Sequence, residues 1–318
     1  MYGCACAFVN PRFHIHFSGA PMRTTKRFTP AVLDRFQREG RGTGILQDYI
    51  PWHRVSRGDP ASSGRSHWHL FRDRQSHLLS DLERSCLHFI SMIPKVEDCL
   101  EQCPLSVEPA IHPLTIYGAA NPLKLFPGTK DIAETLGYRH PQTHGGGTSC
   151  AWVQTTDFVV VFNHERCQKS ILAIAVKPRG VLSKRTRQLL AIERAYWLAR
   201  SAEWLLFTPD LFAPQVKKSL EQISPWTRES LPDVMLQSAA SLTRAHSHLA
   251  YLDLLQVLDA HFGSRDVSQR ALWQSVWHGF LPIDLAHQWR PSRPLRHIGQ
   301  SEFLQLNPVA ARRSSWTS

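Results

Sequence analysis

The sequence predicts a mixed α/β fold in two parts, an α/β core followed by a helical C-terminal domain. Apolar residues recur at helical spacing in two segments, Val-, Ile- and Phe-rich runs lie between those segments, and three further helical patterns follow Pro209 and Pro214. A chain of 318 residues with 42% hydrophobic and 20% charged residues can bury a core in each part. We therefore expect three regions: a basic arm and short helix over residues 1–40, an α/β domain over 41–209 and a helical domain with a flexible tail over 210–318.

The N-terminal half is expected to contain a short basic helix, a long loop and an apolar helix. Pro30 stands where a first helical turn would begin in the basic segment that ends at Arg41. Residues 49–65 are rich in Pro, Gly and Ser, which predicts a loop. Apolar residues then share one helical face over residues 79–92, and Glu83 lies among them. Extended segments are expected at residues 96–105 and 111–117.

Two Val-, Ile- and Phe-rich segments, residues 152–162 and 170–176, predict an antiparallel hairpin. The polar residues between them would form its turn, centred near Arg166 and Cys167. Residues 186–202 follow with a helical pattern, and residues 204–208 return to a short strand. The order helix, antiparallel strands, helix and strand is typical of an α/β nuclease core.

Beyond Pro214 the pattern becomes helical. Three helices are expected, at residues 230–247, 250–261 and 268–277. The sequence FLPIDL at residues 280–285 then predicts a short extended segment. Such an arrangement fits a small winged-helix-like domain.

Charge and composition narrow the classes of partner. The formal net charge of +11 favours a polyanion, because clustered Lys and Arg gain affinity by releasing phosphate counterions. No apolar run approaches the roughly 18 residues that a membrane span needs, and no amphipathic basic helix predicts a membrane anchor. The first residues lack the apolar region of a secretory signal. Translation could begin at Met1 or at Met22. Seven cysteines without a CxxC pair indicate a reducing cytoplasm.

Three residues have the chemistry that phosphodiester hydrolysis requires. Carboxylates such as Glu83 and Asp157 hold Mg²⁺, and a cation such as Lys177 lies near the attacking water or the scissile phosphate. If the hairpin turn is centred on residue 167, Asp157 and Lys177 lie opposite each other at its open end. The helix that carries Glu83 would pack on this sheet and add the second acid.

Several short motifs occur in an order that resembles one known family. They are PWHRVSRGDPASSGRSH at residues 51–67, SDLE at 80–83, LEQCPL at 100–105, TTDF at 155–158, AVK at 175–177 and ERAYW at 193–197. Each motif is weak alone, but the series is hard to obtain by chance. Over residues 40–208 the chain resembles TnsA, the endonuclease subunit of heteromeric cut-and-paste transposases.

This resemblance implies a restriction-endonuclease-like catalytic domain and a winged-helix-like C-terminal domain. It implies that Glu83 and Asp157 bind Mg²⁺, for which Mn²⁺ can substitute, and that Lys177 is the catalytic lysine. Glu193, within ERAYW, is a further candidate metal ligand. The family has Gln or an acidic residue two positions before the lysine, whereas this chain has Ala175. Alanine offers no side-chain ligand, so a water molecule, a backbone carbonyl or Glu193 is expected to complete the metal sphere.

The resemblance also implies partners. TnsA proteins cleave the 5′, non-transferred strands at transposon ends, while a TnsB-like transposase cuts and joins the 3′ ends, and a TnsC-like ATPase is expected beside them. The basic run next to the predicted metal site is the candidate DNA contact. It comprises Arg179, Lys184, Arg185 and Arg187.

Simpler interpretations remain open for each of these residues. Ser80 and Glu83 form an S-x-x-E capping box, in which Glu83 would bond only the backbone of the first turn. Asp157 would then be a turn acid, Lys177 a solvated strand end and Glu193 the partner of a neighbouring arginine. Two other functions also remain open: a stand-alone restriction or repair nuclease, and a catalytically silent subunit that binds DNA or supports assembly.

Overall fold

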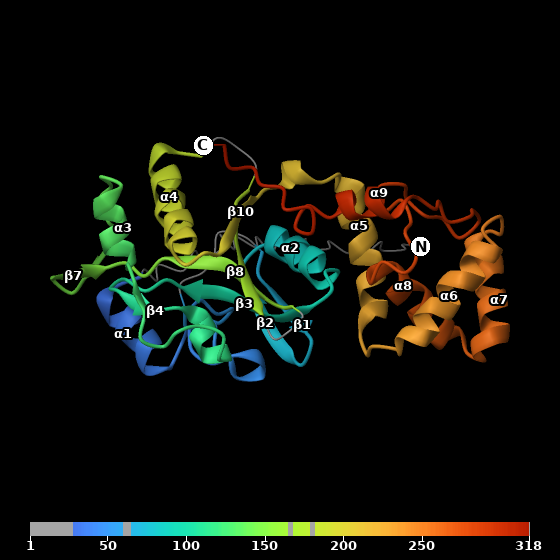
Figure 1. The fold of residues 1–318 in the computed structure, drawn as a ribbon, viewed down its shortest axis with the longest axis horizontal. Helices are drawn as coiled ribbons and strands as arrows, with labels where there is room; N and C mark the ends of the chain where they lie inside the picture. Colours follow the sequence, from blue (N-terminus) through green and yellow to red (C-terminus); the bar gives the residue numbers. More distant parts are fainter. Residues whose placement is uncertain (1–27, 60–64, 165–167, 179–181, 318) are drawn as a thin grey trace, which may run out of the picture.

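The computed structural model describes residues 28–59, 65–164, 168–178 and 182–317. A four-stranded sheet lies at its centre, in the order β10-β9-β8-β3, with β10 parallel to β9 and the other neighbours antiparallel (Figure 1). Its strands are β3 (Val96–Pro104), β8 (Thr155–Asn163), β9 (Lys169–Val176) and β10 (Glu203–Phe207). Within the described ranges, no helix has the length and apolar character needed to cross a membrane.

Helices cover both faces of this sheet. Alternate residues of β8 point to opposite sides, so that Phe158 and Val160 belong to one buried cluster and Val159 and Val161 to another. The helix α2 (Asp81–Ser91) packs into the first cluster, and α4 (Lys184–Ala199) packs into the second beside α3 (Thr129–Thr135). The mixed α/β prediction is therefore confirmed as three layers, helix, sheet and helix.

The predicted hairpin forms, but its register differs from the expectation. Phe158 pairs with Ile174 and Asn163 with Lys169, so the pairing is centred on residue 166 and not on 167. Continued by one residue, this register places Asp157 opposite Ala175, not opposite Lys177. A turn centred one residue earlier shifts the pairing by two residues, which leaves every side chain on its predicted face.

Residues 111–117, expected to be extended, are mostly helical. Ala110–Ile111 forms the short β4, which pairs with β5 (Leu125–Phe126), and Pro113–Tyr117 is the 3₁₀ helix η2. Proline at the first helical position fixes φ at a helical value. The His112 side chain accepts a hydrogen bond from Leu114 N at 3.0 Å and caps this turn. These local bonds outweigh the strand preference of the intervening Ile and Tyr.

Two hairpins were not predicted from the sequence. One consists of β1 (His67–Phe71) and β2 (Arg74–Leu78). The other consists of β6 (Gln142–Gly145) and β7 (Thr148–Ala151), and its turn uses Gly146 and Gly147 with φ of 60° and 76°. Glycine adopts these values without steric cost, so the glycine run forms a hairpin turn.

The predicted helix at Pro30 is α1 (Pro30–Arg38), capped by the side chain of Thr29. It is packed into the structure, since Leu33 and Phe36 form a small cluster with Trp52. The loop around η1 (Leu46–Asp48) and the following residues then lead to the sheet.

The C-terminal part is helical, as predicted (Figure 1). Its three expected helices are α6 (Asp233–Ala245), α7 (Tyr251–Phe262) and α8 (Arg265–Trp277), which pack on one another. The sequence did not predict α5 (Pro214–Ile223) and α9 (Gln300–Leu306), or the short turns η4 (Pro209–Leu211) and η5 (Ser224–Thr227). Among described residues 210–317, strand pairing is limited to an isolated bridge between Ile283 and His297, so the wing stays a prediction.

The C-terminal tail, expected to be flexible, lies along the edge of the sheet. Figure 1 shows the red segment running back from the helical domain to β10. Ser315 N donates to Leu206 O at 2.9 Å, and Leu206 N donates to Ser314 Oγ at 3.0 Å. Trp316 packs edge-on against Trp204, with ring centroids 5.6 Å apart. The tail thus covers backbone groups that an edge strand would otherwise expose.

Candidate active site

Glu83, Asp157 and Lys177 meet at one end of the central sheet. Lys177 Nζ lies 3.0 Å from Asp157 Oδ2, and the same oxygen accepts a hydrogen bond from Val176 N at 2.6 Å. Gln102 Nε2 lies 3.2 Å from Glu83 Oε2 and 3.5 Å from Asp157 Oδ1. The structure therefore brings the three predicted residues together. In the observed register, however, Asp157 lies opposite Ala175 and not opposite Lys177.

Glu83 makes the contacts of a capping box and also faces the site. Ser80 Oγ accepts from Glu83 N at 3.1 Å, and Glu83 Oε2 accepts from Leu79 N at 2.8 Å. These bonds hold the carboxyl group at the start of α2. Burial, and then the charge of Asp157, nevertheless raise the Glu83 pKa to about 8. The two acids lie close enough to repel each other, which is the condition that a bound cation relieves.

Lys177 is held as an ammonium by the acids around it. Burial would lower its pKa, but the charges of Asp157 and Glu193 raise it above the ordinary lysine value. Glu193 is 4% exposed, and its Oε1 accepts from Thr156 Oγ1 at 2.9 Å and from Trp204 Nε1 at 3.3 Å. Burial raises the Glu193 pKa to about 7, against the effect of Lys177. Glu193 therefore connects α4 to β8, the strand that carries Asp157, and to β10.

The oxygen atoms of this site fit a hard divalent cation. A buried amide contacts each of two carboxylates, and Mg²⁺ commonly keeps several waters beside one or two carboxylates. In the described part of the chain, no group of three or more His, Cys, Asp or Glu side chains forms a metal-binding cluster. Ala175 is completely buried in the cluster beneath α4, so a longer side chain there would have to displace its neighbours.

Two residues near the acids were missed by sequence reasoning. Gln102 lies in the LEQCPL motif and His53 in the segment PWHRVSRGDP, so the motif series was the available signal. The His53 ring stacks on Trp152 at 6.1 Å between centroids. Burial lowers the His53 pKa to about 4, although the nearby charge of Asp157 opposes this. His53 is therefore a neutral imidazole beside the site at physiological pH.

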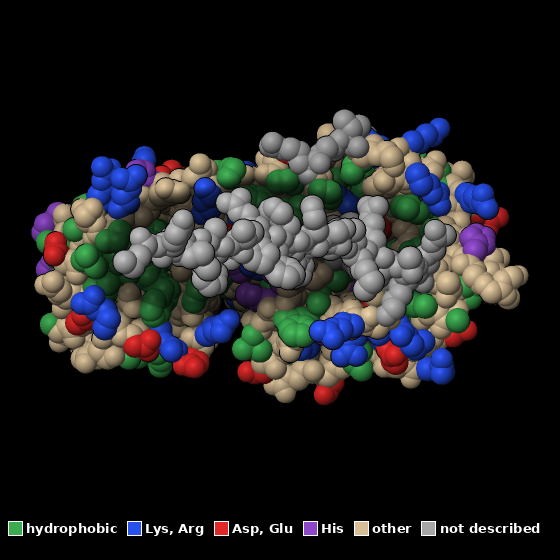
Figure 2. Space-filling model, turned by 180° about the vertical axis from the view of Figure 1, so that it is seen from behind, with side chains coloured by type: hydrophobic (Ala, Val, Ile, Leu, Met, Phe, Trp, Pro, Cys, Tyr) green, Lys and Arg blue, Asp and Glu red, His purple; other side chains and the backbone are tan. Residues whose placement is uncertain are grey.

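The predicted DNA-contacting residues lie mostly at the start of α4. Lys184 and Arg187 are exposed, Arg185 is half-buried, and the first turn holds no acidic residue. Cations are disfavoured at a helix N-terminus, where the helix dipole is positive, and a phosphate would relieve that repulsion. Arg179 lies outside the described residues. On the face opposite to that of Figure 1, Lys and Arg side chains spread over both lobes (Figure 2).

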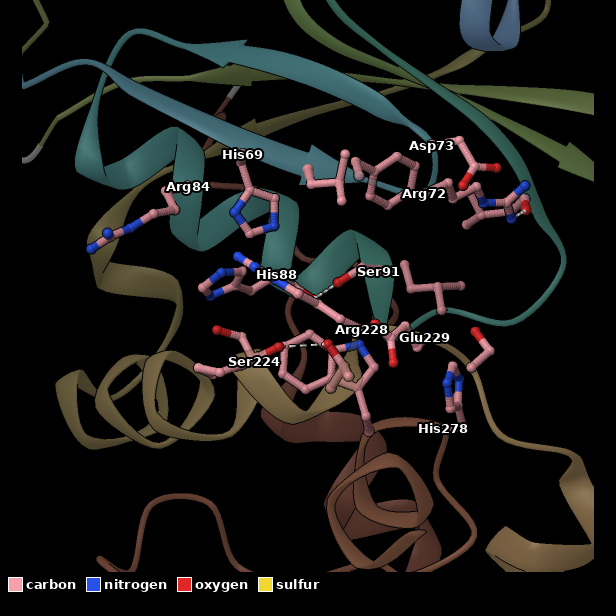
Figure 3. Close-up of a pocket in the computed structure, with 18 of the residues that line it drawn as sticks. His69, Arg72, Asp73, Arg84, His88, Ser91, Ser224, Arg228, Glu229 and His278 are labelled. Atoms are coloured by element: carbon pink, nitrogen blue, oxygen red, sulfur yellow. Dashed lines mark hydrogen bonds between the residues drawn. The ribbon is translucent and has the colours of Figure 1, made fainter. Parts of the chain in front are cut away.

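A separate cleft of about 1090 Å³ lies between the part of the chain that carries the sheet and the C-terminal helices. It is lined by β1, α2, η5 and the end of α8, and Glu83, Asp157 and Lys177 are not among its lining residues. Figure 3 shows His69 and His88 facing each other in this cleft, with ring centroids 5.3 Å apart. This cavity is therefore separate from the acid cluster.

Two histidines that line this cleft, the half-buried His69 and the buried His88, predict acid sensitivity. Burial, and then His69, Arg84 and Lys217, lower the His88 pKa to about 3. Burial, and then Arg228, Arg84 and His67, lower the His69 pKa to about 4. Because the ordinary value is 6.5, the unfolded chain binds more protons than the folded chain below that pH. The free energy of unfolding should therefore fall as pH decreases from about 6.5 to 4. The expected loss is up to about 1.4 kcal/mol for each pH unit and for each of the two histidines.

Thermal unfolding of His88→Leu across pH 7 to 4.5 checks this expectation. The variant should lose less stability on acidification than the wild type, because one buried imidazole no longer takes up a proton on unfolding. His287→Leu, which alters an exposed histidine, is the control and should keep the wild-type slope. An equal slope for His88→Leu and the wild type would contradict the assignment.

Comparison with known proteins places these residues in a family context. The family model described as "TnsA-like endonuclease N terminal" matches residues 121–209, which include Asp157, Lys177 and Glu193. Transposon Tn7 transposition protein TnsA of Escherichia coli is 32% identical over 219 residues, a stretch that covers 68% of this chain and 70% of that protein. The similarity thus extends well beyond the segment matched by the family model.

Proposed function

Because the chain belongs to the TnsA-like endonuclease family, we propose that it is a metal-dependent DNA endonuclease acting on the 5′, non-transferred strands at transposon ends. The observation that carries this proposal is the cluster of Glu83, Asp157 and Lys177 at one end of the sheet. A restriction-endonuclease-like core, with α2 and α4 on opposite faces of the sheet, is the architecture we assign to it. The winged-helix character of residues 210–318 belongs to the same proposal.

The residues of the cluster have distinct roles in this proposal. Glu83 and Asp157 hold the divalent cation, Mg²⁺ or Mn²⁺. When bound, the cation polarises a phosphoryl oxygen and lowers the pKa of a coordinated water. The Lys177 ammonium, held 3.0 Å from Asp157, stabilises the charge that develops at the scissile phosphate. Glu193 acts as a positioning residue, because its charge helps keep Lys177 protonated, and we retain it as a candidate metal ligand.

We assign DNA contact to the basic start of α4 and to Arg179, which precedes that helix in the sequence. Lys184, Arg185 and Arg187 would bind phosphates next to the acid cluster, and Arg179 is proposed with them on sequence alone. Such contacts fix the position of the duplex without reading its sequence. Replacing them should weaken binding to all DNA sequences and reduce its dependence on salt.

A TnsB-like transposase is the partner we propose for cleavage at the transposon end, with a TnsC-like ATPase in the same assembly. The supporting observation is the similarity to a protein named for transposition. Two other functions are tested by the same experiment. A stand-alone nuclease would need no partner, and a catalytically silent subunit would bind DNA without cutting it.

The expected result is that the chain alone cuts DNA poorly and cuts at the 5′ ends when the TnsB-like partner is added. The assay measures nicking of a plasmid that carries both transposon ends, with Mg²⁺ present or chelated. Loss of cleavage on chelation supports the metal-dependent reaction. Robust cleavage by the chain alone would favour the stand-alone nuclease, and absence of 5′ cleavage in the full assembly would favour the silent subunit.

A further inference from the structure

The buried side chain of Gln102 lies between the two acids of the site. Its neighbours in β3 pair with β8, Glu101 with Phe158 and Cys103 with Thr156, so Gln102 stands opposite Asp157. The residue is 2% exposed, and its Nε2 lies 3.2 Å from Glu83 Oε2 and 3.5 Å from Asp157 Oδ1. One amide group therefore contacts both carboxylates.

The backbone of Gln102 is strained. Its φ is 50°, in the left-handed region, which costs a residue with a Cβ atom about 1–2 kcal/mol. The surrounding structure holds this conformation, because Trp52 N donates to Gln102 O at 3.2 Å and Tyr49 OH donates to Glu101 O at 3.0 Å. Glycine would adopt this φ without the penalty. With this backbone conformation, the Gln102 side chain lies between the two acids.

An amide is suited to this position because it can present either of its two ends. Without a cation, its NH₂ group donates to both Glu83 and Asp157 and keeps the two acids in place. After a half-turn about its last bond, the same group presents a carbonyl oxygen, which is a ligand that Mg²⁺ accepts. A lysine here would compete with the cation, and Ala175 on the opposite side of Asp157 contributes no ligand.

We propose that Gln102 is the third side-chain ligand of the divalent cation, supplying from β3 the oxygen that Ala175 in β9 lacks. The inference rests on the metal-dependent function proposed above. It assigns the cation three oxygen donors from three elements, α2, β3 and β8, and leaves the remaining positions to waters or to Glu193. Gln102 thus couples the metal-free and metal-bound forms of the site through the orientation of one amide.

The test measures Mn²⁺ and Mg²⁺ binding to the full chain by titration calorimetry, with the rise in melting temperature on metal addition as a second readout. Gln102→Met keeps the length of the side chain and removes its polar atoms, and it should weaken metal affinity ten- to a hundredfold. Gln102→Glu keeps an oxygen donor and should bind metal at least as tightly as the wild type. Gln154→Met is the matched control, because Gln154 is also buried but bonds Leu189 O away from the acids.

The outcomes separate this inference from the proposed function. Wild-type affinity in a folded Gln102→Met variant would overturn the role of Gln102 while leaving the nuclease proposal intact. If Gln102→Met does not fold, the glutamate variant decides, since a tenfold loss of affinity in Gln102→Glu would show that the oxygen is not a ligand. A wild-type chain that binds neither cation would overturn both proposals. Weakened binding in Gln102→Met, retained binding in Gln102→Glu and an unchanged control support the inference.

Discussion

Replacing Asp157 with Asn is expected to reduce 5′-strand cleavage by about a thousandfold or more, and Lys177→Ala is expected to have a similar effect. The physical reason is that Asp157 contacts both the proposed metal ligand set and the lysine, with its two oxygens facing Gln102 on one side and Lys177 on the other. Metal activation and stabilisation of the developing charge each contribute several kcal/mol to such reactions. Cleavage is measured on transposon-end DNA in the assembly with the TnsB-like partner.

Lys169→Ala is the matched control for this experiment. Lys169 is the first residue of β9, whereas Lys177 directly follows the last, and Lys169 forms an ion pair with Glu97. Its replacement removes a lysine–carboxylate pair without approaching the acid cluster, so cleavage should remain near the wild-type rate. DNA binding and the melting temperature are followed in parallel. Wild-type cleavage by a folded Asp157→Asn or Lys177→Ala variant would show that the site is assigned to the wrong residues.

Replacing Glu101 with Leu is expected to lower the free energy of unfolding by about 3–5 kcal/mol. Glu101 Oε2 lies 2.7 Å from Arg74 Nη1, and the two side chains are 1% and 8% exposed. Burial raises the Glu101 pKa in spite of Arg74, so desolvation is only partly offset within the pair. Removing one partner leaves the other charge buried and uncompensated, which is why the single variant is costly. Urea unfolding followed by far-ultraviolet circular dichroism measures the change.

Two further variants give this prediction its controls. The double variant Arg74→Leu/Glu101→Leu should recover much of the lost stability, since apolar pairs commonly replace buried ion pairs without loss. Glu221→Leu removes the more exposed pair with Arg84, both side chains being 31% exposed, and should cost less than about 1 kcal/mol. A Glu101→Leu variant as stable as Glu221→Leu would mean that the buried pair does not hold β2 to β3.

The sequence predicted those parts of the fold in which local pattern and tertiary structure agree. The Val-, Ile- and Phe-rich runs of β8 and β9 predicted an antiparallel hairpin, which forms, and the helix that carries Glu83 was expected from its apolar face. The predicted hairpin register was wrong, but the prediction that Asp157 and Lys177 lie close together was not affected. A shift of two residues preserves which face each side chain occupies, and the long Lys177 side chain reaches Asp157 from its actual position.

Other features depend on contacts that no local pattern records. The β1 and β2 strands contain His, Arg and Gln, and Arg74 becomes a core residue only because Glu101 from another strand pairs with it. The left-handed backbone of Gln102 depends in the same way on Trp52 and on the contacts of its neighbours. The motif LEQCPL marked this glutamine as part of the resemblance, but its contact with both acids follows from the pairing of β3 with β8.

Because the C-terminal tail returns to β10, the segment that contains the C-terminal helices begins and ends at the same strand. The chain leaves the sheet after Phe207, forms the helices and comes back so that Ser314 and Ser315 bond Leu206 of the same strand. Both ends of the helical segment are therefore attached to β10. There, Phe207 O accepts a hydrogen bond from Lys177 N at 3.0 Å. The strand to which both ends of the helical segment attach is thus joined by one backbone hydrogen bond to Lys177, the lysine of the acid cluster.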